Sequence, residues 1–271
     1  MKVKTLLLVL FFSVAHAQDQ PAAEKLVNEG VLLHDKGDFV GAIDKYSKAL
    51  ELDKDNFLAL SEKALSLNAA GKYEESIVVS KQAILTHANE DIANVYVSYA
   101  NSLDQLKKTD QALKVYDQGI VEFPNYYQLP FNKGICYLNN NSYQRAIDCF
   151  QKALLINPKH AGSLNAIGIV EMRSRRIPAI LAFSRFLIVE SQTPRSKQNL
   201  KNLQSLLMQG VEQTGKRAVS ISISSSMLSD STGIKNENDF SQTDLILSMT
   251  AGLDFDKKNK NKKPSGDERN K

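Results

Sequence analysis

The sequence has 271 residues, 42% of them hydrophobic, no Trp, and a net charge of +4. The excess positive charge lies at the end of the chain, because the stretch from Asp256 to Lys271 holds seven Lys or Arg and three acidic residues. The preceding residues are charge-balanced, which argues against a uniformly basic surface and against nucleic acid as a partner.

The first residues have the composition of an export signal. Lys2 and Lys4 precede an apolar run from Thr5 to Ala15, and small residues follow at Ala15-His16-Ala17. This run of about 11 residues is too short for a bilayer, which takes roughly 20. The pattern predicts a signal peptide over 1–17 and a short lead-in over 18–22, with export to the periplasm, the cell envelope or the medium. A membrane anchor is the competing and weaker interpretation.

The segment from Tyr126 to His160 has the pattern of two antiparallel helices. Gly134 and Ala146 are small enough to let two helix backbones approach closely, and Phe150 fills the space beside them. Asn residues supply the turn between the helices, and Pro158 ends the second helix. This segment therefore predicts one helical hairpin.

The same pattern recurs with a period of about 34 residues, which is a far stronger signal than one match. The small residue of the first helix recurs five times, as Gly30, Ala64, Ala100, Gly134 and Gly168. The turn residues align as Gly37, Gly71, Lys107, Asn141 and Arg175. Asp91 and Ile92 form an insertion before the third unit. The fifth unit aligns if one residue near its turn is deleted, which places Ala179 and Phe183 where Ala146 and Phe150 stand one unit earlier.

These residues make the chain resemble the tetratricopeptide repeat (TPR) family, of an exported bacterial type, over roughly Ala23 to Gln192. The resemblance implies an all-α fold, a right-handed superhelical solenoid of about five hairpins. The expected repeats are 23–56, 57–90, 93–126, 127–160 and 161–194. Solenoids grow by stacking neighbouring units, so one elongated repeat domain over 23–194 accounts for most of the chain.

The resemblance also implies that the second, fifth, sixth, ninth and twelfth positions of each first helix line a concave groove. The expected peptide-binding residues are Asn28, Val31, Asn94, Asn101, Gln128, Phe131, Asn132, Asn165 and Met172. An Asn amide donates and accepts hydrogen bonds at once, so a row of Asn suits the backbone of an extended peptide. The alternative is that these are ordinary solvated helix residues.

One subtype of the family holds a C-terminal carboxylate with Lys, Asn and Arg side chains. Asn101 and Asn132 match its Asn positions, but Val97, Gly162 and Ala166 occupy basic ones. Without those charges a carboxylate would be held poorly, so an internal extended segment is the expected ligand.

The residues after the repeats predict a capping helix over 195–215, with Gly215 as its end. Val219, Ile221 and Ile223 alternate with Ser, which predicts a strand in a 216–255 extension that also holds a short helix. No clear partner strand follows, so the strand is expected to lie on the repeats, to pair with another chain, or to pair with residues absent from the sequence. The tail 256–271 is expected to be disordered.

No catalytic, phosphate-binding or metal-binding motif accompanies the repeats, so neither a cofactor nor a metal is expected. Cys136 and Cys149 are either a disulfide pair or two small core residues. The expected function is a non-catalytic scaffold that binds a protein or peptide. The alternatives are an activity carried by a C-terminal extension, or binding of anions or lipid surfaces by the basic tail; membrane contact is expected to be peripheral at most.

Overall fold

The computed structural model describes residues 21–87, 90–215, 218–222, 240 and 243–251. The chain forms two compact units that meet in sequence between Pro158 and Lys159. The expected signal peptide and the expected disordered tail lie outside the described residues. In the described part of the chain, every helix is too short or too polar to cross a membrane.

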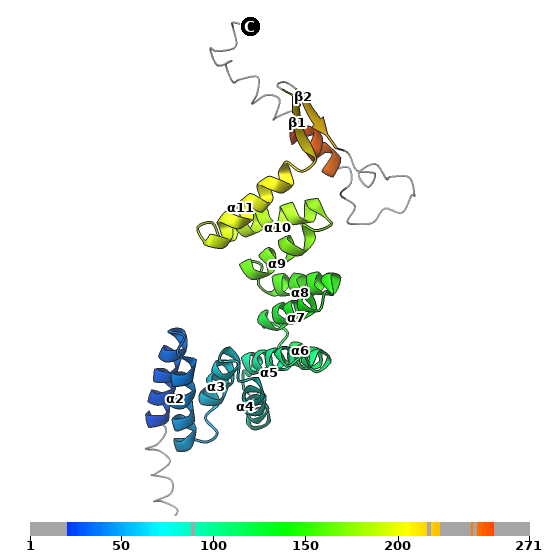
Figure 1. Cartoon of the computed structure of the whole chain (residues 1–271). Coiled ribbons are helices and arrows are strands. Elements are labelled where there is room, and N and C mark those ends of the chain that lie inside the picture. The colour runs from blue at the N-terminus through cyan, green and yellow to red at the C-terminus, as the bar shows by residue number, and fades with distance from the viewer. Residues whose placement is uncertain (1–20, 88–89, 216–217, 223–239, 241–242, 252–271) are drawn as a thin grey trace, which may run out of the picture. The chain divides into compact units, whose positions relative to one another are not determined.

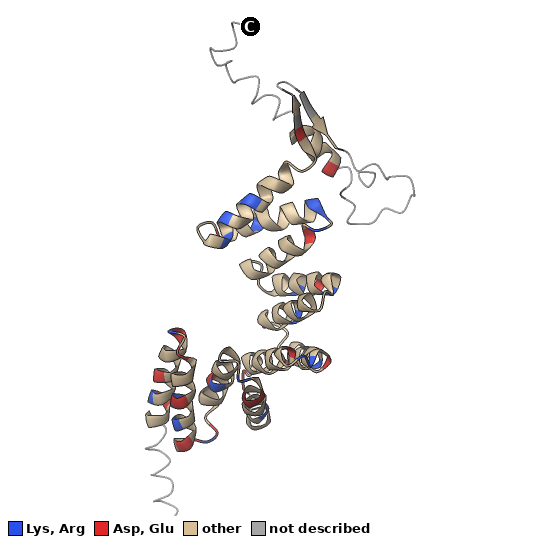
Figure 2. Cartoon of the chain, viewed as in Figure 1, with Lys and Arg blue, Asp and Glu red and all other residues tan. Residues whose placement is uncertain are grey.

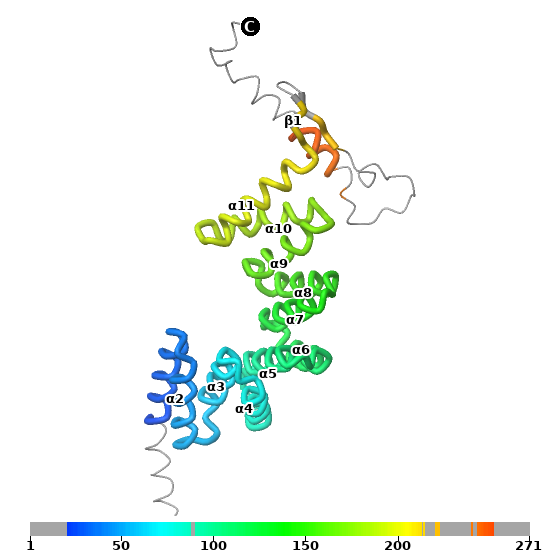
Figure 3. Tube along the Cα trace, in the orientation of Figure 1, coloured from blue at the N-terminus to red at the C-terminus, as the bar shows by residue number. Residues whose placement is uncertain are grey.

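The first unit consists of helical hairpins that follow one another along the chain (Figures 1 and 3). Its helices are the one over 21–35, α2 (Phe39–Leu52), α3 (Phe57–Ala69), α4 (Tyr73–Thr86), α5 (Ala93–Gln105), α6 (Thr109–Glu122), α7 (Gln128–Asn139) and α8 (Tyr143–Ile156). From α2 to α7, each helix contacts the one that follows it, and α5 also contacts both α3 and α7. This arrangement confirms the predicted all-α repeat fold.

The turns inside these four hairpins share one backbone conformation. The turn residue has a left-handed backbone in each, at Gly37 (φ 82°), Gly71 (φ 76°), Lys107 (φ 61°) and Asn141 (φ 57°). In each turn the next backbone N–H donates to a carbonyl five residues earlier, at 2.9 Å, as from Asp38 to Leu33. This bond satisfies a helix-end carbonyl and stops the helix at the same place in every repeat.

A glycine packed against an aromatic ring sets the closest approach of the two helices in several hairpins. A Cβ atom added to Gly134 would lie 2.6 Å from Cε1 of Phe150, which is fully buried. The same contact recurs twice, between Gly30 and Tyr46 and between Gly168 and Phe183. In the second hairpin the equivalent positions are Ala64 and Ser80, so a larger residue on one helix accompanies a smaller one on the other.

The second unit contains one further hairpin and the helix that covers it. Its helices are α9 (Ala161–Glu171), α10 (Arg176–Val189) and α11 (Pro194–Leu207). Gly168 and Phe183 are one residue closer in sequence than Gly134 and Phe150, as the predicted deletion requires. The turn is correspondingly different, because Arg175 has an extended backbone (φ −129°) instead of a left-handed one.

The predicted capping helix over 195–215 is wrong in its second half. α11 ends at Leu207, and β1 (Val211–Gly215) pairs antiparallel with β2 (Ala218–Ile221), with Val211 opposite Ile221. Gly210 makes the break, since its φ is 80° and a Cβ there would lie 3.0 Å from the Ser222 carbonyl oxygen. The strand predicted from Val219 and Ile221 therefore has its partner before it in the chain, not after it.

A buried arginine holds the last described helix, over 243–251, against this unit. Arg176 pairs with Asp244 at 2.8 Å and donates to the Ser248 hydroxyl at 2.6 Å. It also donates to the backbone carbonyls of Leu206 (2.7 Å) and Leu207 (3.2 Å), at the end of α11. A carbonyl-rich helix end suits a cation, so one side chain joins three helices.

Charge is distributed differently along the chain. Figure 2 shows acidic and basic residues mixed on the helix over 21–35 and on α2, whereas Lys and Arg predominate on α10 and α11. The overall balance of charge in the sequence therefore conceals differences in charge between individual helices.

Candidate functional site

The first helices of neighbouring repeats in the first unit are joined by hydrogen bonds between side chains. These bonds link His34 to Ser66 (2.6 Å), Asn94 to Ser61 (2.7 Å), Asn68 to Ser102 (2.8 Å) and Cys136 to Asp104 (3.2 Å). They connect the helix over 21–35 with α3, α3 with α5, and α5 with α7. We call the surface formed by the second, fifth, sixth, ninth and twelfth positions of these four helices the first-helix face.

The Asn residues predicted to bind a peptide are mostly engaged inside the protein. The Asn94 amide donates to Ser61, the Asn101 carbonyl oxygen accepts from the Tyr116 hydroxyl, and the Asn132 amide donates to the Gln128 backbone carbonyl at 2.8 Å. The first two bonds tie helices together, and the third closes on its own helix. The structure therefore uses these amides as connections within and between repeats, which the sequence pattern did not distinguish from ligand contacts.

The other predicted residues of this face lie on its surface to different degrees. Asn28 is exposed, while Val31, Gln128 and Phe131 are half-buried. The Phe131 ring lies 5.8 Å, centroid to centroid, from the ring of Phe150. Part of Phe131 therefore belongs to the core of the fourth hairpin, and part of it to the surface of the face.

Asn165 and Met172 belong to the second unit and are described with it. The Asn165 carbonyl oxygen accepts a hydrogen bond from the Asn199 amide at 2.7 Å, which joins α9 to α11. Met172 is 38% exposed at the end of α9. Asn165 thus joins two helices, as Asn94 does, and the side chain of Met172 lies partly on the surface.

Sequence reasoning overlooked two other kinds of residue on the first-helix face. Leu58 and Leu65, at the second and ninth positions of α3, are 47% and 39% exposed. Glu62, at the sixth position of the same helix, is half-buried and has no ion pair within the described residues. The same five positions of each first helix would have identified them if every residue type at those positions had been considered, and not mainly Asn.

The electrostatic environment of Glu62 is unusual for a surface carboxylate. Burial raises the pKa of Glu62, the neighbouring His34 lowers it, and the Asp35 carboxylate raises it further. Burial disfavours the charged form, and a second carboxylate nearby does the same. Burial is thus the main reason why the surroundings of Glu62 favour its protonated form.

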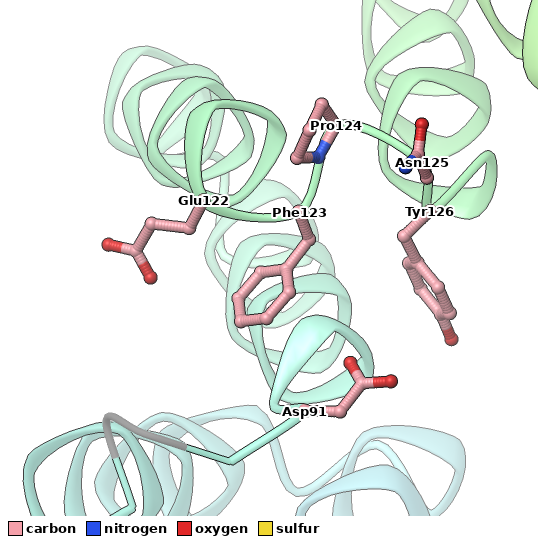
Figure 4. A pocket seen from close by; sticks show the side chains of 6 residues that line it. All are labelled: Asp91, Glu122, Phe123, Pro124, Asn125 and Tyr126. Carbon is pink, nitrogen blue, oxygen red and sulfur yellow. The ribbon is translucent and has the colours of Figure 1, made fainter.

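A cavity of about 320 Å³ lies where the segment leading into α5 approaches the loop after α6 (Figure 4). Its lining residues are Asp91, Glu122, Phe123, Pro124, Asn125 and Tyr126. The Glu122 carboxylate accepts a hydrogen bond from the Tyr96 hydroxyl at 2.9 Å. The cavity includes part of the Asp91-Ile92 insertion.

The two cysteines are free and buried in the structure, without the disulfide that was one alternative. Burial raises the pKa of Cys136 to about 12, and its hydrogen bond to Asp104 acts in the same direction. Burial also raises the pKa of Cys149. Both groups are protonated near neutral pH and are therefore poor nucleophiles. Over the described ranges, no cluster of three or more His, Cys, Asp or Glu is arranged to hold a metal ion.

Comparison with known proteins supports the repeat pattern. The profile of the tetratricopeptide repeat family matches residues 131–160. The chain is 29% identical over 168 residues to TPR repeat-containing protein MJ1428 of Methanocaldococcus jannaschii, covering 59% of this chain and 30% of that protein. It is also 29% identical over 156 residues to the STIP1 homolog of Dictyostelium discoideum, covering 46% of this chain and 28% of that one. The chain thus spans less than a third of the length of these relatives.

Solved structures show the same fold at lower identity. The thermophilic TPR protein TTC0263 of Thermus thermophilus matches with a TM-score of 0.56 and 17% identity, over 68% of this chain and 98% of that one. PilF of Pseudomonas aeruginosa matches with a TM-score of 0.57 and 18% identity, over 71% and 91% of the two chains. At such identities the likeness concerns the fold.

Proposed function

We propose that this tetratricopeptide repeat chain is a non-catalytic scaffold whose first-helix face binds an extended segment of a protein partner. The observation that carries this proposal is the construction of that face. Hydrogen bonds between neighbouring first helices fix their side chains relative to one another, and the same face carries partly exposed aliphatic side chains. A prearranged face of this kind binds with little loss of conformational entropy.

The apolar part of the face supplies the contact area. Leu58 and Leu65 lie one above the other on α3, seven residues apart, and Phe131 adds an aromatic surface on α7. Burying such side chains contributes about 25 cal/mol for each Å² of apolar surface removed from water. Asn28, which is exposed, and Gln128, which is half-buried, are the polar residues of the face that would hydrogen-bond the backbone of the bound segment.

The site of action is part of the same proposal. The signal-peptide pattern over 1–17 supports export, and a scaffold in the periplasm or cell envelope would meet exported partners there. N-terminal sequencing of the protein purified from its own cells tests this directly. A mature chain that begins at Gln18 is the expected result, and a chain that retains Met1 would contradict export by this route.

Cross-linking mass spectrometry in the native cells tests the binding face. We expect specific cross-links from the first unit to a protein partner, which fall sharply in the Leu58→Ser, Leu65→Ser variant. The control is Val121→Ser, Leu155→Ser, which removes aliphatic side chains that are 81% and 83% exposed on second helices of the same unit. Equal cross-linking in the two variants and the wild type would refute a first-helix binding face.

A further inference from the structure

A second cavity of the first unit lies where the second repeat meets the third. Its volume is about 260 Å³, and its lining residues come from α4, α5 and α6: Lys81, Ile84, Leu85, Tyr96, Tyr99 and Gln118. None of them belongs to the first-helix face, because Tyr96 and Tyr99 hold the fourth and seventh positions of α5 and the others lie on second helices. The cavity is therefore separate from that face.

The junction that holds this cavity departs from the regular repeat. Six residues, 87–92, link α4 to α5, whereas four link α2 to α3 and five link α6 to α7. The longer link contains the Asp91-Ile92 insertion. The cavity thus occurs at the junction where the sequence itself is irregular.

The next junction along the chain shows a different pair of side chains at the equivalent positions. There Lys133, at the seventh position of the fourth repeat, forms an ion pair with Asp117, the ninth residue of α6. One repeat earlier these positions hold Tyr99 and Lys81. The Lys81 ammonium lies 5.7 Å from the centre of the Tyr99 ring. A cation beside an aromatic ring therefore stands here in place of an ion pair.

Lys81 has no carboxylate partner in the described part of the chain. It takes part in no ion pair there, and no acidic residue lines the cavity. The Lys81 residue is exposed, so a ligand can reach its charge. A carboxylate of a ligand is complementary to this cation, whereas a cationic ligand is repelled by it.

The rest of the lining supplies apolar surface and one amide. Leu85 is 83% exposed, and Ile84 and Tyr99 are half-buried. A pocket for a drug-sized ligand measures roughly 300–1,000 Å³. The present cavity is smaller, so it has room for a single side chain of a larger partner. Gln118 adds an amide that both donates and accepts hydrogen bonds.

We propose that this cavity is a second peptide-binding site, whose ligand is a segment of a partner protein in which an apolar side chain adjoins Asp or Glu. The apolar side chain packs against Tyr99 and Leu85, and the carboxylate pairs with Lys81. The Gln118 amide hydrogen-bonds the backbone of the same segment. The site adds to the proposed function and does not depend on the first-helix face.

Phage display with a depletion step tests this site. Random linear peptides are selected on the purified protein and depleted on the Lys81→Asp, Tyr99→Lys variant, which carries at this junction the residue types of Asp117 and Lys133. We expect the surviving peptides to combine an apolar residue with an adjacent Asp or Glu. Measured by fluorescence anisotropy, they should bind about fivefold more weakly to Lys81→Met and about tenfold more weakly to Tyr99→Ala. The matched control is Lys152→Met, which removes an exposed Lys from α8 and should leave the affinity unchanged.

The outcomes separate this site from the first-helix face. The selected peptides should keep their affinity for the Leu58→Ser, Leu65→Ser variant, and a loss there would place them on the first-helix face and overturn the second site. Surviving peptides without an acidic residue, or with an affinity that Lys81→Met leaves unchanged, would overturn the acidic ligand. If no peptide survives the depletion, the site itself is refuted. Lys81 lies on the surface, so Lys81→Met should melt as the wild type does and gives a test that does not depend on the other variants.

Discussion

Replacing Gly134 by Ala tests the close contact that defines the fourth hairpin. The new methyl group would lie 2.6 Å and 2.7 Å from two ring atoms of Phe150 and 3.2 Å from the Ala146 carbonyl oxygen. Ordinary contacts between carbon atoms are about 3.5–4.0 Å. The ring is fully buried, with the Phe131 ring on one side, so the helices must move apart to accommodate the methyl group.

The magnitude follows from two opposing effects. Overpacking a core costs about 1–3 kcal/mol. Ala is favoured over Gly within a helix by about 1 kcal/mol, which offsets part of that cost. We expect a net loss of about 1–2 kcal/mol in the free energy of unfolding, and a melting temperature lowered by roughly 2–8 °C for a protein of this size.

Thermal and urea unfolding followed by far-ultraviolet circular dichroism measure this loss. The matched control adds Phe150→Leu, which removes the ring atoms that the methyl group meets. The double variant should then be more stable than the sum of the two single effects by about 1 kcal/mol or more. A Gly134→Ala protein that melts at or above the wild-type temperature, or strictly additive effects, would refute the packing argument.

Three further predictions concern buried or partly buried ionisable groups. Arg176→Met should lower the free energy of unfolding by about 3 kcal/mol, because it leaves carboxylate and carbonyl groups without their cation. It should also speed amide hydrogen exchange in 243–251, and unchanged exchange there would contradict the role of Arg176 in holding this helix. Cys136 and Cys149 should react with a thiol reagent at pH 8 only after unfolding, and fast reaction of the native protein would contradict their burial. Glu62→Gln should raise the free energy of unfolding at pH 7 by less than about 1 kcal/mol. The pKa of Glu62 is raised in the folded protein, so the wild-type protein loses stability as pH rises through that pKa, and the variant does not. Unfolding at pH 7 and pH 4 measures the change, and a variant less stable than the wild type at pH 7 would contradict it.

The repeat fold could be predicted because its determinants are local and periodic. Gly134, the left-handed turn at Asn141 and the helix end before Pro158 each act within a few residues, and their recurrence fixes the hairpins without knowledge of any distant contact. The deletion in the fifth repeat was visible for the same reason, since Gly168 and Phe183 must still meet.

The sequence alone left two possible positions for the end of the capping helix. Both Gly210 and Gly215 are plausible helix ends, and Val211 fits the apolar face of a longer helix. Pairing of β1 with β2 decides for Gly210, because the bond from Ser222 N–H to the Gly210 carbonyl requires the hairpin to begin there.

The register of the first helices, read from sequence alone, determined which residues stand on the first-helix face. Only the tertiary structure decided what each of them does there. Asn94 and Asn101 have partners 33 and 15 residues away, on other helices, and nothing in their own neighbourhood distinguishes an amide that holds repeats together from one that awaits a ligand. Only the tertiary structure likewise showed that Asp35 and Glu62 have no ion pair within the described repeats, because whether a Lys or Arg reaches them depends on how several helices pack together.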